Sequence, residues 1–133
     1  MIVIDGNGAV LGRLASYAAK EALKGEEIAV VNVDDIIITG NKEQIRRHYD
    51  EKRTKVGSTR KGPKISRDTE RIVKRAIRGM LPNARFTGRG RDAIKRVKCY
   101  RGIPKEFESA KMIKFEENKF KFIKVGTLYK WTE

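Results

Sequence analysis

Short runs of apolar, mostly β-branched residues alternate with a helical pattern in the first 40 residues, and this alternation constrains the fold most strongly. The run at residues 2–5 ends at a Gly-Asn-Gly turn, and residues 11–23 then place apolar side chains at helical spacing. Two more apolar runs follow at residues 28–33 and 36–39. This order of elements is typical of an α/β fold with crossover helices and a mainly parallel sheet.

Three further helices are expected in the middle of the chain. The first covers residues 42–51, and the third is a short helix over residues 92–96 that leads to a fourth strand over residues 97–100. The second is capped by Asp68 or Thr69 and stops at Pro82. Its predicted buried stripe consists of Ile72, Val73, Ala76, Ile77 and Met80.

These elements predict one α/β domain over residues 1–133, with a mainly parallel four-stranded sheet and helices on both of its faces, which makes three α/β/α layers. Residues 105–133 are expected to form a C-terminal extension. Within it, apolar side chains alternate on both sides of residues 116–119, which indicates a hairpin turn there.

Positive charge is concentrated in the middle of the chain. Residues 42–101 hold 21 of the 31 Lys and Arg residues against six acidic residues, whereas residues 1–41 hold three basic and six acidic residues. A basic field of this kind matches a polyanion, and nucleic acid is the commonest one. The alternative is a solvated surface that only keeps the protein soluble, although solubility does not require charge of one sign to be clustered.

Two Gly-containing basic segments, residues 52–67 and 85–91, are predicted to be loops that reach into RNA. Irregular basic loops suit the uneven surface of folded RNA, and the sequence has no helix-turn-helix, zinc-finger or basic-zipper pattern. Basic side chains on the helices are expected to neutralise further phosphates. The candidate RNA-binding residues are Arg13, Lys42, Arg46, Arg47, Lys52, Arg53, Lys55, Arg60, Lys61, Lys64, Arg67, Arg71, Lys74, Arg75, Arg78, Arg85, Arg89 and Arg91.

The first turn resembles a dinucleotide-binding fingerprint, with Gly6, Gly8 and Gly12 after a strand and Asp34 and Asp35 after the next one. The spacing of these glycines differs from the fingerprint by one residue, and no second domain would hold a substrate. One interpretation is a small nucleotide-binding enzyme. The other, which we favour, is a tight turn that lets the helix pack on the strand.

The segment Thr39-Gly40-Asn41-Lys42 is a stronger anion-site candidate, because it offers main-chain N–H groups and a lysine at a helix start. The alternative for this segment is an ordinary helix cap. His48 stands alone and indicates a surface or RNA-contacting residue, Cys99 indicates a core position, and the acidic residues form no convincing acid–base pair. We therefore expect no enzymatic activity, no cofactor, no metal and no small-molecule substrate.

Two further expectations concern the cell compartment. One Cys and one His cannot form an internal disulfide or a metal cluster, which fits a reducing, cytoplasmic setting. No apolar stretch approaches 18 residues and the first residues resemble a strand rather than a signal peptide, so no membrane association is expected.

Five motifs carry a family resemblance over nearly the whole chain. They are Leu11-Gly12-Arg13-Leu14-Ala15-Ser16, Val31-Asn32, Thr39-Gly40-Asn41-Lys42, Arg78-Gly79-Met80-Leu81-Pro82 and Tyr100-x-Gly102-Ile103-Pro104. In this order they resemble the L-thirteen family of large-subunit ribosomal proteins, in its archaeal and eukaryotic branch. The segment after Pro104 matches the family least.

The resemblance implies a three-layer α/β/α fold and a structural role on large-subunit ribosomal RNA. It also implies neighbouring large-subunit ribosomal proteins as partners, a part in subunit assembly and a ribosome-bound location. A general nucleic-acid chaperone without a fixed site remains the alternative among RNA-binding functions. Such a chaperone would bind any RNA with equal affinity.

Overall fold

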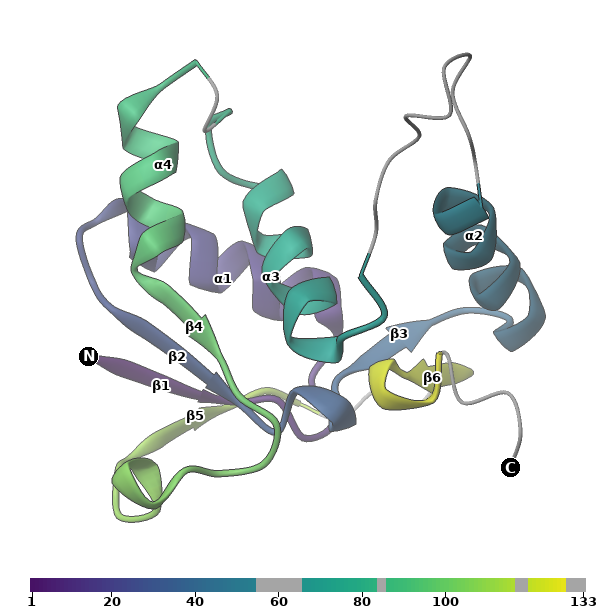
Figure 1. Ribbon diagram of the computed structural model, residues 1–133. Helices are drawn as coiled ribbons and strands as arrows, with labels where there is room; N and C mark the ends of the chain where they lie inside the picture. Colours follow the sequence, from purple (N-terminus) through teal and green to yellow (C-terminus); the bar gives the residue numbers. More distant parts are fainter. Residues whose placement is uncertain (55–65, 84–85, 117–119, 129–133) are drawn as a thin grey trace.

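Four parallel strands form the main sheet of the computed structural model, which describes residues 1–54, 66–83, 86–116 and 120–128 (Figure 1). The strand order is β4-β2-β1-β5. The bounds of these strands are β1 Ile2–Asp5, β2 Ile28–Val31, β4 Val97–Cys99 and β5 Met112–Lys114. The predicted mainly parallel four-stranded sheet is therefore confirmed, because β1 pairs in parallel with both β2 and β5, and β2 pairs in parallel with β4.

Side chains on the two faces of this sheet enter two separate apolar clusters. Ile4, Ile28 and Val30 pack beneath the helices α1 (Leu11–Leu23), α3 (Thr69–Gly79) and α4 (Gly88–Lys95), which lie together on one side of the sheet (Figure 1). The alternate residues Val3 and Val31 pack on the other face against Phe107 of the 3-10 helix η2 (Lys105–Phe107). Both faces are thus covered, as a parallel sheet requires, and the predicted α/β/α layering is confirmed with a thin second layer.

Helix α1 forms the centre of the larger cluster. Its buried side chains, at helical spacing, are Leu11, Leu14, Ala15, Ala18, Ala19 and Ala22. The alanines let α1 approach the sheet and its neighbouring helices closely. At the C-terminal end of α1, the main-chain oxygen of Ala22 accepts a hydrogen bond from Nη1 of Arg96 over 3.1 Å.

A left-handed residue turns the chain out of the main sheet after β2. Asn32 has φ 55°, a conformation that asparagine tolerates better than most residues, and its Nδ2 donates to Asp5 Oδ1 over 3.0 Å. The 3-10 helix η1 (Val33–Asp35) follows, and β3 (Ile37–Thr39) then pairs antiparallel with β6 (Phe122–Lys124) in a second, two-stranded sheet. The third predicted strand therefore does not join the main sheet; β5 takes the fourth position.

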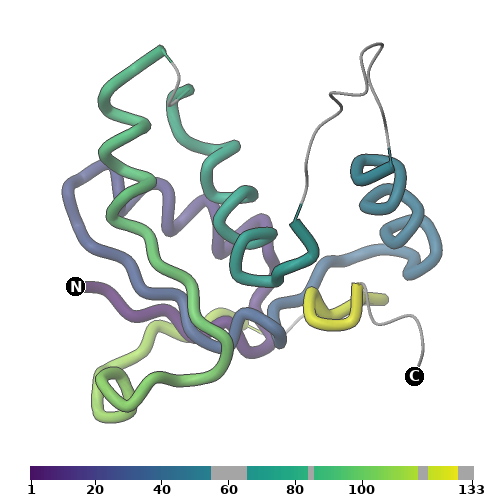
Figure 2. Tube along the Cα trace, in the orientation of Figure 1, coloured from purple at the N-terminus to yellow at the C-terminus, as the bar shows by residue number. Residues whose placement is uncertain are grey.

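Helix α2 (Lys42–Thr54) has no buried residue and stands apart from the other three helices (Figure 2). Only Ile45 and Tyr49 reach the larger apolar cluster, as partly buried side chains. α2 therefore gains little from packing, and most of its surface faces solvent.

Arg101 joins the end of β4 to the start of α3. Its main-chain N–H donates to Glu70 Oε1 over 3.1 Å, and its guanidinium donates to Thr69 Oγ1 over 3.0 Å and to Asp68 Oδ1 over 3.2 Å. Asp68 also caps α3, since its carboxylate accepts the N–H of Glu70 over 3.4 Å. These contacts orient α3 relative to the sheet.

The structure corrects the predicted loops. The helix predicted to end at residue 51 continues to Thr54, so Lys52 and Arg53 lie on α2 rather than in a loop. The loop predicted at residues 85–91 is also wrong from Gly88 onward, because α4 begins there. Gly90 and Ala93 are buried, so close packing of this helix outweighs the low helix propensity of its glycines.

The predicted hairpin at residues 116–119 is wrong as well. Its two apolar segments belong to different sheets, since β5 pairs with β1 and β6 pairs with β3. Residues 117–119 themselves lie outside the described part of the chain. Met80 was expected in the core but is 46% exposed, because α3 ends at Gly79 and Met80 lies just beyond its last turn.

Candidate nucleic-acid interface

Four predicted RNA-binding cations lie together on α3. Helix α3 buries Ile72, Val73 and Ile77, so residues at the complementary helical positions face outward. Together with Ser66 and Ile94 these cations line an open cavity of about 380 Å³. The α3 basic surface, as we call it, consists of Arg71, Lys74, Arg75 and Arg78.

A second, smaller cavity of about 200 Å³ extends this surface toward α2. Arg75 lines both cavities, and Tyr49 and Lys52 of α2 face it across the smaller one. The Lys52 ammonium lies 5.7 Å from the centre of the Tyr49 ring, within the range of a cation–π contact. Positive charge therefore continues from α3 to the last turns of α2.

The first turns of α2 differ in charge from α3. Arg46 and Arg47 share a surface hollow with the carboxylates Glu43, Asp50 and Glu51. Three acids beside two arginines offset their field, so the structure does not join these two predicted residues to the α3 basic surface. They are weaker candidates for phosphate contact than the α3 cations.

The other predicted residues are more dispersed. Arg13 on α1, Lys42 on α2, Arg67 before α3, and Arg89 and Arg91 on α4 are exposed. Arg53 is half-buried at the end of α2. The remaining predicted residues, Lys55, Arg60, Lys61, Lys64 and Arg85, lie outside the described residues.

The glycine-rich first turn has a structural explanation. A Cβ atom on Gly6 would lie 2.7 Å from Ile36 Cγ1 and 2.8 Å from the main-chain oxygen of Val31. The two acids that a ribose site would need already face cations: Asp34 lies 3.9 Å from Arg101 and Asp35 lies 3.5 Å from Lys124. This geometry supports the tight turn over the nucleotide-binding enzyme.

Cys99 lies half-exposed at the end of β4, yet its thiol is well shielded. Burial raises the pKa of this thiol to about 12, partly offset by the nearby Lys74 charge. A raised thiol pKa keeps the sulfur protonated and unreactive at neutral pH. Cys99 therefore packs against the larger apolar cluster, and the effect of burial on its thiol outweighs that of the Lys74 charge.

Cys99 is expected to react with a thiol reagent such as Ellman's reagent roughly 10²–10³-fold more slowly in the native protein than in denaturant at pH 8. The physical reason is the small thiolate fraction left by a pKa near 12. Stopped-flow absorbance would measure both rates. Equal rates would show that the thiol is ionised and accessible in the native fold.

Within the described residues, no group of three or more His, Cys, Asp or Glu side chains could hold a metal ion. Among the described helices, none is long and apolar enough to cross a membrane.

A family model described as Ribosomal protein L13 matches residues 1–106, which is most of the chain. The chain belongs to this family. The L-thirteen resemblance predicted from the sequence is therefore confirmed, and with it the expectation of a structural ribosomal protein rather than an enzyme.

Archaeal members of the L-thirteen family are similar to this chain over most of its length. The large ribosomal subunit protein uL13 of Methanocaldococcus jannaschii is 46% identical over 133 residues, covering 98% of this chain and 96% of that protein. The uL13 protein of Archaeoglobus fulgidus is 45% identical over 86% of this chain and 72% of its own length. The uL13 protein of Thermoplasma acidophilum is 44% identical over 87% and 83%.

Sequence reasoning missed two features of this surface. Tyr49 was assigned only to the apolar face of its helix, yet it also lines the cavity between α2 and α3. The second feature is the segment around Lys121, which lies beside the start of α2. The spacing of Ile45 and Tyr49 does not indicate that Tyr49 lines a cavity. The position of Lys121 depends on the pairing of residue 39 with residue 122, which no local sequence pattern predicts.

Proposed function

We propose that this L-thirteen family protein is part of the large ribosomal subunit, binds large-subunit ribosomal RNA and supports assembly of that subunit. The observation that carries the proposal is the α3 basic surface, where four cations lie on one helix face. The names of the relatives, all large ribosomal subunit proteins, support the same assignment.

The α/β body acts in this proposal as a rigid mount for α3. The buried side of the helix packs against α1 and the sheet, and Arg101 fixes its first turn through Asp68 and Thr69. Arginine is suited to this task because its planar guanidinium binds phosphate oxygens in pairs. A preorganised row of guanidinium groups loses little conformational entropy when it meets the RNA backbone.

RNA binding would neutralise phosphates and release condensed counterions. If six to ten phosphates are contacted, the affinity for a large-subunit ribosomal RNA transcript is expected to fall by roughly 10³–10⁵-fold between 50 and 200 mM salt. Filter binding or fluorescence anisotropy at several salt concentrations would measure the slope. An affinity that does not change with salt would contradict the proposal.

The chaperone alternative makes a different prediction for specificity. A fixed site on large-subunit ribosomal RNA should bind that transcript more tightly than a small-subunit ribosomal RNA transcript of equal length at the same salt concentration. Equal affinities would favour a chaperone without a fixed site. Sedimentation of the chain with the large subunit of its own cells, retained at moderate salt, would test the ribosome-bound, cytoplasmic location.

A further inference from the structure

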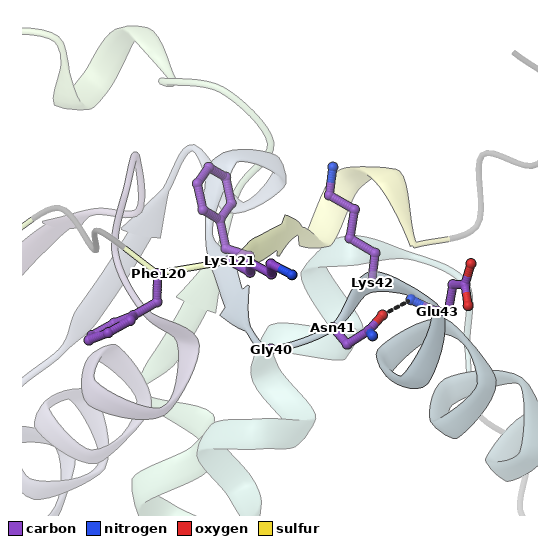
Figure 3. A pocket seen from close by; sticks show the side chains of 7 residues that line it. Gly40, Asn41, Lys42, Glu43, Phe120 and Lys121 are labelled. Carbon is purple, nitrogen blue, oxygen red and sulfur yellow. Dashed lines mark hydrogen bonds between the residues drawn. The ribbon is translucent and has the colours of Figure 1, made fainter.

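A cavity of about 630 Å³ lies between the start of α2 and the C-terminal segment. Residues 40–43 line one side and residues 120–122 line the other (Figure 3). The pairing of β3 with β6 aligns Thr39 with Phe122, and the N–H of Gly40 donates to the main-chain oxygen of Lys121 over 2.9 Å. These hydrogen bonds join two segments that are 80 residues apart in the sequence.

The walls of this cavity carry two exposed phenylalanines. Phe120 is 77% exposed and Phe122 is 37% exposed, whereas their neighbour Ile123 faces inward and is 2% exposed. Large apolar side chains that remain exposed on one short segment are typical of a contact surface. Because these side chains line a cavity, we expect the partner to insert a small group between them and α2.

The same cavity also carries positive charge. Lys42 and Lys121 are both exposed, and the Lys121 side chain points across toward Asn41 and Lys42 (Figure 3). Phe120 lies at the opposite end of the cavity from Asn41 (Figure 3). One acid, Glu43, also lines it; its N–H donates to Asn41 Oδ1 over 3.0 Å, which caps α2. The cavity therefore has an aromatic end and a cationic end.

An unpaired nucleotide matches both ends. Its base stacks on an aromatic ring whatever its identity, and its phosphate pairs with ammonium groups. The volume lies within the range usual for small-molecule and nucleotide sites. An acidic peptide would use the two lysines but offers no base to stack on an exposed phenylalanine ring. A paired RNA strand would present no base face to the rings.

We propose that residues 40–43 and 120–122 form a binding site for one unpaired nucleotide of RNA, with the base stacked on Phe120, the more exposed of the two rings, and a phosphate between Lys42 and Lys121. This inference rests on the proposed RNA-binding function, but it uses residues away from the α3 basic surface. Residues 120–122 also lie beyond the part of the chain that the family model matches.

The test uses the full chain and a five-nucleotide RNA, four uridines around a central 2-aminopurine, whose fluorescence is quenched when the base stacks. The wild-type chain is expected to quench the probe. Replacing Phe120 with Leu keeps an apolar side chain but removes the ring, so the affinity should fall by about fivefold or more. Lys121→Gln should also weaken binding and lower its salt dependence.

Two control variants test whether a loss of binding is specific to the cavity or follows from losing any exposed apolar side chain or any positive charge. Ile103→Ala removes another exposed apolar side chain outside the cavity, and Lys114→Gln removes the same charge from β5. Neither is expected to change quenching of the probe. Each variant is also titrated with the large-subunit ribosomal RNA transcript, and thermal unfolding confirms that each is folded.

The outcomes separate this inference from the proposed function. If Phe120→Leu quenches the probe as the wild type does while the transcript still binds, the nucleotide site is wrong and the proposed function stands. If neither RNA binds the wild-type chain, both are wrong. If a hexaglutamate peptide displaces the probe at equal concentration, the cavity is a site for acidic polypeptides instead.

Discussion

Replacing Arg71, Arg75 and Arg78 with Gln is expected to weaken binding to large-subunit ribosomal RNA by roughly 10²–10³-fold at 100 mM salt. The three residues share one outward face of α3 and line one cavity, so the substitution removes the centre of the α3 basic surface. The slope of log affinity against log salt should also fall by about two to three, since each lost phosphate contact contributes roughly one. Fluorescence anisotropy over 50–200 mM salt would give both quantities.

A charge-matched triple variant separates this surface from the overall charge of the protein. Lys98 lies on β4, Lys105 on η2 and Lys111 between η2 and β5. All three are exposed, and none of them lines the cavities of the α3 basic surface. Replacing these three with Gln removes the same net charge and should leave binding within a fewfold of the wild type. Equal losses in the two triple variants would mean that affinity follows net charge and not the α3 basic surface.

Gly6→Ala is expected to lower the free energy of unfolding by roughly 2–4 kcal/mol. The added Cβ would meet Ile36 Cγ1 at 2.7 Å and the main-chain oxygens of Val31 and Asn32 at 2.8 and 2.9 Å. Ile36 is fully buried and the two oxygens belong to the backbone, so none of these atoms can move without disturbing the core. Urea unfolding followed by circular dichroism would measure the change.

Gly12→Ala is the matched control in the same motif. Apart from its chain neighbours and the backbone of its own helix, no described atom lies within 4 Å of the position of its Cβ, and the residue lies in the first turn of α1. Alanine favours the helix by up to about 1 kcal/mol over glycine, so this variant should be as stable as the wild type or slightly more stable. Similar losses in the two variants would contradict the packing explanation for Gly6.

Elements with strong local signals were predicted well from the sequence. The helix over residues 11–23 has six buried positions at helical spacing, and its observed bounds agree with the prediction. The α3 prediction was equally clear, because Asp68 caps it and the amphipathic pattern separates Ile77 from Arg78. In both elements, local sequence and tertiary packing favour the same structure.

The choice of strand partners could not be predicted in the same way. Residues 37–39 and 122–124 are short, mostly apolar runs that fit any sheet, and β3 leaves the main sheet through the left-handed residue Asn32 and the 3-10 helix η1. The false hairpin at residues 116–119 has the same cause, since two apolar runs around a polar turn satisfy the local rule. Their real partners lie about 80 to 110 residues away in the sequence.

The candidate interface was predicted residue by residue but not as a surface. The sequence places Arg46 and Arg75 in the same basic segment, whereas the fold surrounds Arg46 with carboxylates and joins Arg75 to three other cations. The charge of a residue can be read from the sequence, but its neighbours depend on helix packing. The aromatic end of the cavity at α2 depends on the same kind of long-range pairing.

The strand order also determines when the fold can be completed during synthesis. β1 is made before both strands that flank it, yet it lies inside the sheet, and its second partner, β5, is made about 110 residues later. β3 likewise pairs with β6, which is made about 80 residues later. A nascent chain that stops before residue 112 would expose one edge of β1, and such an edge pairs readily with other chains. The main sheet is therefore complete only after β5 has been made, and the exposed edge of β1 has to be protected from other chains until then.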